Sequence, residues 1–102
     1  MRKIFFILIL FSGFSFAGTT GKLTGLITDS QNGEPLIGAN ILIEGTDLGA
    51  ASNAEGKFLI LNIPPGIYKV RVSYLSYETV LYEQVRIVVD QTTELTVSLS
   101  PK

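Results

Sequence analysis

The sequence predicts an all-β fold, a β-sandwich, from three observations. Apolar and polar residues alternate with a period of two over several short stretches, as they do in half-buried strands. Clusters of Gly, Pro, Asn and Asp separate these stretches, which is typical of turns. No segment after the first seventeen residues carries the 3.6-residue apolar stripe of an amphipathic helix. Because no helix is available to cover a parallel sheet, we expect two packed antiparallel sheets, and six or seven strands fit the length.

The clearest strand follows two consecutive prolines. Four of its residues share one face at a spacing of two, namely Tyr68, Val70, Val72 and Tyr74. Pro64 and Pro65 cannot donate hydrogen bonds to a sheet, and Gly66 relaxes the steric limits where the chain reverses. Residues 57–61 form another strand, so we expect the Pro-Pro-Gly segment to be the turn of a hairpin at the centre of the domain.

Further strands are predicted on both sides of this hairpin. Residues 23–28 and 39–44 come before it, with Leu23, Gly25 and Ile27 inward in the first and Ala39, Ile41 and Ile43 inward in the second. Residues 50–52 allow only a short strand or an extended arm. After the hairpin, residues 78–83 and 85–89 form either two extended runs or one bulged strand. Residues 93–99 form the last strand, with Leu95, Val97 and Leu99 on one face.

The first seventeen residues have the order of a secretory signal peptide. A basic start at Arg2 and Lys3 precedes an apolar run over residues 4–11, and Ser15 and Ala17 supply the small residues of a cleavage site. The alternative, an uncleaved membrane anchor, needs about 20 apolar residues, and this run is shorter. We therefore expect a signal-peptide helix over 1–17, a flexible lead over 18–21 and one domain over 22–102.

Composition limits the classes of function. The chain has 8 basic and 9 acidic residues, and loss of Arg2 and Lys3 with the leader leaves 8 − 2 = 6 basic residues and a net charge of −3. This balance lacks the dense basic surface that nucleic-acid binding requires. The absence of cysteine excludes both disulfides and an amino-terminal lipid anchor on cysteine. The mature domain must therefore hold its fold by packing alone, without a membrane span.

The sequence offers little material for catalysis or for a cofactor. It has no His and no Cys, so the usual zinc sites and nucleophile–base pairs cannot be assembled, and we expect no enzyme activity, no catalytic residues and no cofactor. Four acidic residues, Asp29, Glu34, Asp47 and Glu55, lie in predicted turns, where solvated carboxylates are expected.

One loop has some of the features of a calcium site. The segment 29–34 is rich in oxygen donors, but Gly33 is its fifth residue, whereas the EF-hand loop requires glycine at the sixth. A hydrogen-bonded turn is therefore the favoured interpretation, and no metal site is predicted.

Two sets of residues are candidates for binding. Leu26, Leu42 and Leu59 occupy the solvent-facing phase of three strands, and if those strands are neighbours they form an apolar face that docks a partner. Tyr77 and Tyr82 are less constrained by strand phase, and an exposed pair of this kind would suit an oligosaccharide. Sheet edges are a further source of contacts.

Six segments in a fixed order carry a family resemblance. They are Leu23-Thr24-Gly25-Leu26-Ile27-Thr28-Asp29, Gly33-Glu34-Pro35-Leu36-Ile37-Gly38-Ala39-Asn40-Ile41, Glu44-Gly45-Thr46, Asn53-Ala54-Glu55-Gly56-Lys57-Phe58, Ile63-Pro64-Pro65-Gly66-Ile67-Tyr68 and Leu75-Ser76-Tyr77. Together they resemble the carboxypeptidase regulatory-like domain, a transthyretin-like seven-stranded sandwich. The variant most similar is the amino-terminal extension of TonB-dependent outer-membrane receptors. One departure is Ser76, where relatives often carry glycine.

The resemblance implies a location and partners. It places the chain in the periplasm or on the periplasmic side of the outer membrane, in contact with an envelope protein or with carboxyl-terminal receptor domains. The plug and barrel of such receptors are not among these residues, so transport is not assigned to them. We therefore expect a non-catalytic exported module for interaction or structural support, and the alternative is a carbohydrate-binding module with a tyrosine platform.

Overall fold

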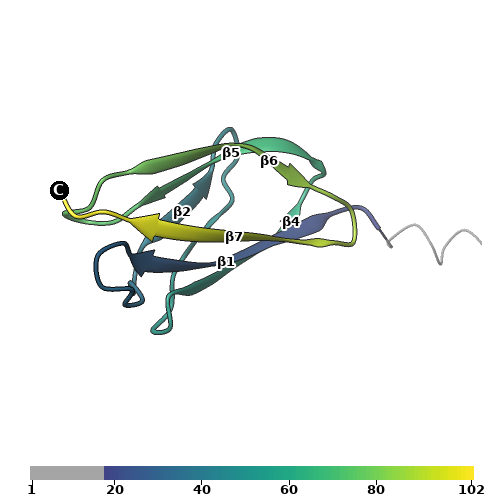
Figure 1. Cartoon of the computed structure of the whole chain (residues 1–102). Helices are drawn as coiled ribbons and strands as arrows, with labels where there is room; N and C mark the ends of the chain where they lie inside the picture. The colour runs from purple at the N-terminus through teal and green to yellow at the C-terminus, as the bar shows by residue number, and fades with distance from the viewer. Residues whose placement is uncertain (1–17) are drawn as a thin grey trace, which may run out of the picture.

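The computed structural model describes residues 18–102 as seven strands in two layers (Figure 1). The strands are β1 (Gly21–Asp29), β2 (Asn40–Ile43), β3 (Gly49–Ala51), β4 (Lys57–Ile63), β5 (Gly66–Ser73), β6 (Val80–Ile87) and β7 (Thr92–Leu99). Sheet A has the order β4-β1-β7, and sheet B has the order β3-β2-β5-β6. The predicted seven-stranded sandwich is confirmed.

The predicted leader lies outside the described residues, as do Ser15 and Ala17. Residues 18–102 contain no helix with the length and hydrophobicity needed to span a membrane. Strand β1 begins at Gly21, and the carbonyl of Thr20 already accepts a hydrogen bond from the Asp90 N–H at 2.9 Å.

The core lies between the two sheets and is built from the predicted inward phases, with the addition of Ile63, which the register shift of β4 turns inward. Its largest fully buried side chains are Leu23, Ile27, Ile41, Ile43, Ile63, Leu99, Val70, Val72 and Val97. Because side chains alternate across a strand, each of these residues is followed by one that faces away from the core. Ser52 and Asp29 are the polar residues buried with them.

One strand pairing differs from the expected antiparallel sheets. Strands β1 and β7 run parallel, and their register extends without a shift from Lys22 opposite Thr92 to Asp29 opposite Leu99. The first and last strands of the domain are therefore neighbours in sheet A. A strand's local pattern of apolar residues is the same in either direction, so the alternation could not reveal this parallel pair.

The Pro-Pro-Gly segment is a corner between the sheets, and the predicted hairpin is wrong. Strand β4 pairs with β1 in sheet A, whereas β5 pairs with β2 and β6 in sheet B. Because neither Pro64 nor Pro65 has an N–H, the ladder of sheet A ends there and the chain passes to the other layer. The Tyr68 hydroxyl donates to the Pro64 carbonyl at 2.6 Å and holds the corner. Gly66 starts β5 without a positive φ.

Strand β6 is one bulged strand, which was one of the two predicted alternatives. Tyr68 and Val70 of β5 face Val85 and Tyr82 of β6, so β6 has one more residue than β5 between these pairs. Gln84 lies in that interval with φ 60. The bulge keeps both Tyr82 and Val85 on the inner side of the strand.

Candidate functional site: the outer surface of sheet A

The three leucines predicted as one face lie on two different sheets. Leu26 of β1 and Leu59 of β4 belong to adjacent strands of sheet A, whereas Leu42 belongs to β2 in sheet B. Strand β2 pairs with β3 and β5, so its outer side faces away from sheet A. The expectation of a single contiguous face is therefore corrected: Leu42 is separated from the other two.

A smaller apolar surface remains on sheet A. Leu59 lies opposite Thr24 of β1, which places it diagonally from Leu26, and Leu61 follows two residues later on the same side of β4. Leu59 is 53% exposed and Leu61 is 48% exposed. Leu61 was missed in the sequence, although its two-residue spacing from Leu59 was the signal that could have identified it. We call Leu26, Leu59 and Leu61 the sheet A leucines.

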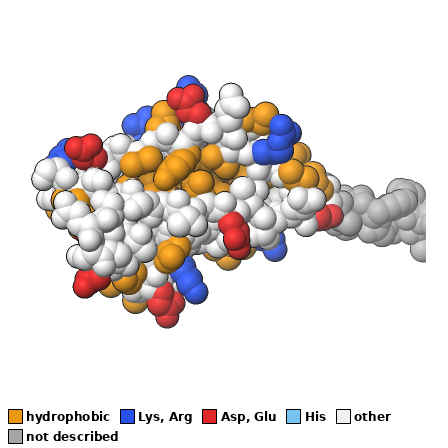
Figure 2. Space-filling model, in the orientation of Figure 1, with side chains coloured by type: hydrophobic (Ala, Val, Ile, Leu, Met, Phe, Trp, Pro, Cys, Tyr) orange, Lys and Arg blue, Asp and Glu red, His pale blue; other side chains and the backbone are white. Residues whose placement is uncertain are grey.

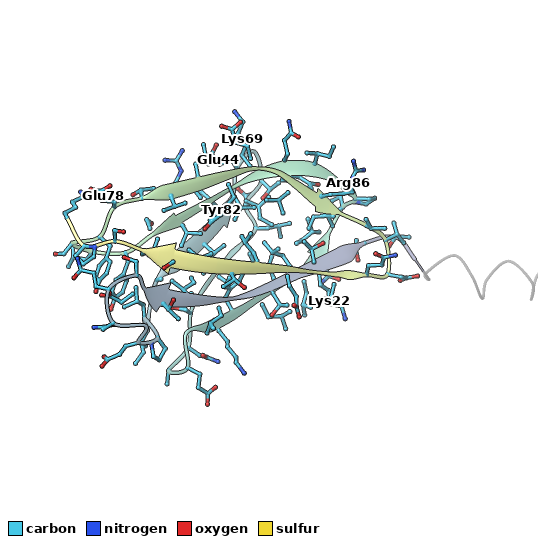
Figure 3. All side chains as sticks on the ribbon, viewed as in Figure 1. Lys22, Glu44, Lys69, Glu78, Tyr82 and Arg86 are labelled. Carbon is cyan, nitrogen blue, oxygen red and sulfur yellow. The ribbon has the colours of Figure 1, made fainter. Side chains whose placement is uncertain are left out.

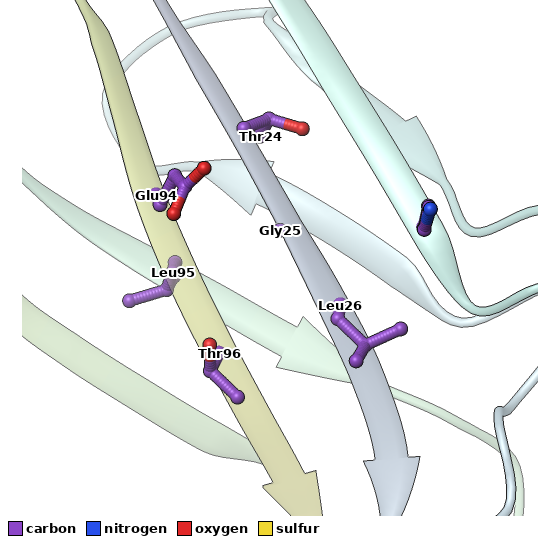
Figure 4. Close-up of a pocket in the computed structure, with 7 residues that line it drawn as sticks. Thr24, Gly25, Leu26, Glu94, Leu95 and Thr96 are labelled. Atoms are coloured by element: carbon purple, nitrogen blue, oxygen red, sulfur yellow. The ribbon is translucent and has the colours of Figure 1, made fainter.

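A shallow hollow lies beside these leucines (Figure 4). Its lining residues come from the three strands of sheet A: Thr24, Gly25, Leu26, Lys57, Glu94, Leu95 and Thr96. The side chain of Leu95 lies on the inner side of β7, so this residue borders the hollow from beneath. Lys57 and Glu94 are exposed and lie on the two strands that flank β1. The hydroxyl of Thr24 donates to the Phe58 carbonyl at 2.9 Å, so this donor is already in use. The hollow is therefore lined by polar and apolar groups together, between one cation and one carboxylate.

Close packing under the hollow requires glycine at position 25. A Cβ built there would lie 2.1 Å from the Leu95 carbonyl oxygen and 2.5 Å from the Phe58 ring. The backbone of β1 therefore approaches β7 and the core more closely than any side chain would allow. This approach sets the position of the three strands that present the candidate surface.

The two tyrosines proposed for sugar binding pack against the core. Tyr77 and Tyr82 are both half-buried, and Tyr82 lies on the inner side of β6, where Figure 3 shows it between the layers. Tyr77 follows β5, its ring centroid lies 5.3 Å from that of Tyr74, and its hydroxyl is bonded to Asp29. The pair therefore does not form a flat, freely exposed platform.

Asp29 is buried, in contrast to the solvated turn carboxylate predicted for it. It is the last residue of β1, and its Oδ2 accepts a hydrogen bond from the Tyr77 hydroxyl at 2.5 Å. Its Oδ1 accepts from the backbone N–H groups of Gln31 at 2.7 Å and Asn32 at 3.3 Å. The sequence did not reveal this buried, bonded carboxylate, because its tyrosine partner is 48 residues away.

These bonds change the titration of both side chains. The Tyr77 hydroxyl, followed by the Gln31 N–H, lowers the pKa of Asp29, because donors favour the ionised carboxylate. The same bond raises the pKa of Tyr77, since loss of its proton would remove the donor and place two negative charges together. Three donors hold the Asp29 carboxylate in place, so we assign the pair a structural role.

The oxygen-rich loop over residues 29–34 is closed by its own hydrogen bonds. In addition to the bonds from Gln31 and Asn32, the Gly33 N–H donates to the Asp29 carbonyl at 2.8 Å. The Glu34 N–H donates to the Asn32 side chain at 2.9 Å. Across residues 18–102, no group of three or more His, Cys, Asp or Glu is placed to hold a metal ion.

Sequence comparison connects the chain to one family and one class of receptor. The profile of the carboxypeptidase regulatory-like domain matches residues 22–100. The TonB-dependent receptor P3 of Formosa agariphila is 27% identical over 79 residues. That match takes in 78% of this chain and 8% of the receptor, so the chain spans a small part of the length of this relative.

Structural comparison supports the fold. The Bacillus anthracis TIE protein superposes with a TM-score of 0.68 at 19% identity, over 81% of this chain and 17% of that one. A cohesin–X–dockerin complex from Acetivibrio cellulolyticus superposes with a TM-score of 0.67 at 21% identity, over 79% of this chain and 58% of that one. A putative carbohydrate binding protein from Bacteroides uniformis superposes with a TM-score of 0.63 at 16% identity, over 82% of this chain and 43% of that one. At these identities the likeness concerns the fold alone.

Proposed function

Because this chain belongs to the carboxypeptidase regulatory-like domain family, we propose that it is a non-catalytic, exported module that docks a neighbouring domain or envelope protein. Its location would be the periplasmic side of the outer membrane, as the amino-terminal module of a TonB-dependent receptor or as a stand-alone relative. The observation that carries the proposal is the contiguous set of sheet A leucines beside the hollow. A contact surface of this kind needs no catalytic group.

The size of the leucine surface favours a tethered or neighbouring partner. Full burial of one leucine side chain stabilises an association by about 1.5–3 kcal/mol, and roughly half of that remains for Leu59 and Leu61, which are already half-covered. Three such side chains supply a few kcal/mol, on the order of a weak complex. A weak contact becomes effective when the partner belongs to the same chain or is held at high local concentration.

Site-specific photo-crosslinking in cells tests the docking surface. A photoreactive residue in place of Leu59, in the complete reading frame, should crosslink to another part of the same chain or to an envelope protein. The matched position is Leu42, which is 42% exposed on the opposite sheet. Equal crosslinking at both positions, or none at Leu59, would exclude sheet A as the docking face.

The exported location has its own test. The full chain should be recovered from the envelope fraction of expressing cells, and mass spectrometry should find Gly18 as its first residue if the small residues Ser15 and Ala17 define the cleavage site. Replacing Ala17 with a bulky residue should leave the leader attached. Cytoplasmic retention of the unaltered chain would contradict the proposed location.

The carbohydrate-binding alternative receives less support from the site. Tyr77 and Tyr82 present only part of their rings, because both pack against the core. Titration with oligosaccharides, followed by tyrosine fluorescence, separates the two functions. Saturable binding that is lost in Tyr82→Ala but kept in Tyr68→Phe would favour the sugar-binding module.

A further inference from the structure

The four edge strands of the two sheets differ in how well they are protected against pairing with a strand of another chain. Strand β3 has only three residues, β4 has a register shift and Asn62 at φ 60 before two prolines, and β6 is bulged at Gln84. Short strands, bulges and prolines are the devices by which proteins block pairing at an edge. Strand β7 has none of them: it is eight residues long, pairs with β1 in unbroken register and contains no proline.

The backbone groups that face the free side of β7 can be identified. The carbonyls of Gln91 and Leu99 accept hydrogen bonds from Lys22 and Ser30, so they point toward β1. Because residues alternate along a strand, the carbonyls and N–H groups of 93, 95 and 97 point the same way. The N–H and C=O groups of Thr92, Glu94, Thr96 and Ser98 point outward, and within residues 18–102 they have no backbone partner.

This free edge borders an apolar strip of half-buried side chains between β7 and β6. The strip is bounded at one end by the hydrogen bond from the Glu78 N–H to the Ser100 carbonyl and at the other by the bond from the Thr93 hydroxyl to the Arg86 carbonyl, each 2.8 Å. Half-buried Val80, Tyr82 and Leu95 pack against the core and lie on the inner sides of these two strands. Hydrophobic side chains gather on this side of the molecule (Figure 2), and Figure 3 labels Glu78, Tyr82 and Arg86 along it.

We propose that the free edge of β7 is a docking site for an extended segment of another protein, which adds to sheet A as a strand. Its backbone pairs with the outward groups of Glu94, Thr96 and Ser98, which lie between the contacts of β6 with Thr93 and of Glu78 with Ser100. Its alternate side chains are apolar and cover Leu95, Tyr82 and Val80, since side chains of an added strand point alternately into and away from the sandwich. This site is separate from the sheet A leucines, so either can exist without the other.

Charge at the rim adds a second requirement for the incoming segment. Glu78, Glu83 and Glu94 are exposed on the strands and the turn that border the strip, and the basic residues beside them are Arg86 and, at the Glu78 end, Lys102. The rim therefore has an excess of negative charge. A segment with Lys or Arg at its outward positions is electrostatically complementary, whereas an acidic segment is repelled.

Amide hydrogen exchange provides the test. The probe is a short synthetic peptide that alternates Val with Lys and Thr, and the protein is the chain recovered from the envelope of expressing cells. In the free protein the amides of Glu94, Thr96 and Ser98 should exchange faster than those of Leu95 and Val97, which are bonded to β1. The peptide should slow exchange at the three outward amides, whereas the same peptide N-methylated at every amide should have no effect.

A matched pair of variants places the effect on the edge. Thr96→Pro removes one outward N–H without touching the β1 ladder, a position at which edge strands tolerate proline. It should weaken peptide binding by about tenfold or more relative to Thr96→Val, which keeps the N–H. The exchange pattern of the unaltered chain decides the question even where Thr96→Pro does not fold.

Three results would overturn the proposal. The first is an N-methylated peptide that binds as well as the parent peptide. The second is protection of the outward amides in the free protein that rises with its concentration, which would assign the edge to a second copy of the chain. The third is equal peptide binding by Thr96→Pro and Thr96→Val.

Discussion

At the scale of single residues, Ser76 adopts a backbone conformation that favours glycine. Its φ is 72°, in the left-handed region that residues other than Gly, Asn and Asp seldom adopt. Its carbonyl accepts a hydrogen bond from the Lys102 N–H at 2.9 Å, and the neighbouring Tyr77 forms a bridge with Pro101, so the conformation is fixed by long-range contacts. The glycine that the family resemblance implies at this position would therefore have a physical reason.

Ser76→Gly should stabilise the domain. The left-handed conformation destabilises a serine by about 1–2 kcal/mol, and glycine removes this strain. The greater freedom of glycine in the unfolded chain offsets part of the benefit, so the free energy of unfolding should rise by roughly 0.5–1 kcal/mol. Urea denaturation measures it. Gly38→Ser is the mirror control, because Gly38 has φ 84 and open space around its Cβ position, so that serine there should destabilise. A loss of stability in Ser76→Gly would show that the backbone of Ser76 is not strained.

The Asp29–Tyr77 bond should make stability depend on pH at both extremes. The pKa of Asp29 is lowered in the folded state, so its contribution is present above the unfolded value near 4 and is lost as pH falls through the folded pKa. The pKa of Tyr77 is raised, so its contribution is present below about 10 and is lost as pH rises through the folded pKa.

Tyr77→Phe isolates this bond. Loss of the hydroxyl removes the largest cause of the lowered Asp29 pKa, so that pKa should rise and acid unfolding should begin at a higher pH. Tyr74→Phe is the control, since the Tyr74 ring packs against Tyr77 at a tilt, and the hydroxyl bonded to Asp29 is that of Tyr77. Carboxyl chemical shifts followed against pH give the Asp29 pKa directly. An identical titration in the two variants would assign the shift to the Gln31 and Asn32 N–H groups alone.

At the scale of elements, Ser52 fastens the loop before β2 to the end of β3. Its hydroxyl donates to the Leu36 carbonyl at 2.6 Å and accepts from the Ala39 N–H at 2.9 Å. Its backbone also pairs with Ala39 and Gly38, each at 2.9 Å. The side chain is 5% exposed, so water cannot replace these bonds.

Ser52→Ala should destabilise the domain by about 1–3 kcal/mol, because it leaves a buried N–H and a buried carbonyl without their partner. The exposed Ser98→Ala should change stability by less than about 0.5 kcal/mol. Thermal or urea unfolding compares the two. A Ser52→Ala variant as stable as Ser98→Ala would show that Ala39 and Leu36 find other partners.

The sequence predicts which face of each strand is buried, but it does not predict which strands pair. The inward phases of Val70, Val72 and Val97 followed from alternation, which is a property of each strand alone. The partners of the strands did not: the parallel pairing of β1 with β7 and the corner at Pro64 depend on contacts distant in sequence. For the same reason the sequence identified exposed leucines but could not place Leu42 on the other sheet.

At the scale of the whole molecule, the parallel pairing sets how the domain responds to force. The start of β1 lies beside the start of β7, and the two strands end together at Asp29 and Leu99. The beginning of the first strand and the end of the last therefore lie at opposite ends of the sandwich (Figure 1). A pull between them slides β1 past β7 and loads all the hydrogen bonds of this ladder at the same time.

Single-molecule pulling should therefore show a strong dependence on direction. Handles at Gly18 and Lys102 shear the β1–β7 ladder, whereas handles at Asn32 and Lys102, both beyond the same end of the ladder, separate it one bond after another. The first geometry should need a clearly higher force at equal loading rate, because forced unfolding is governed by the barrier to breaking the loaded bonds. Thr96→Pro should leave that force unchanged, since its N–H points away from β1. Equal forces in the two directions would mean that another contact yields first, and the four-stranded sheet B would then be the place to look for it.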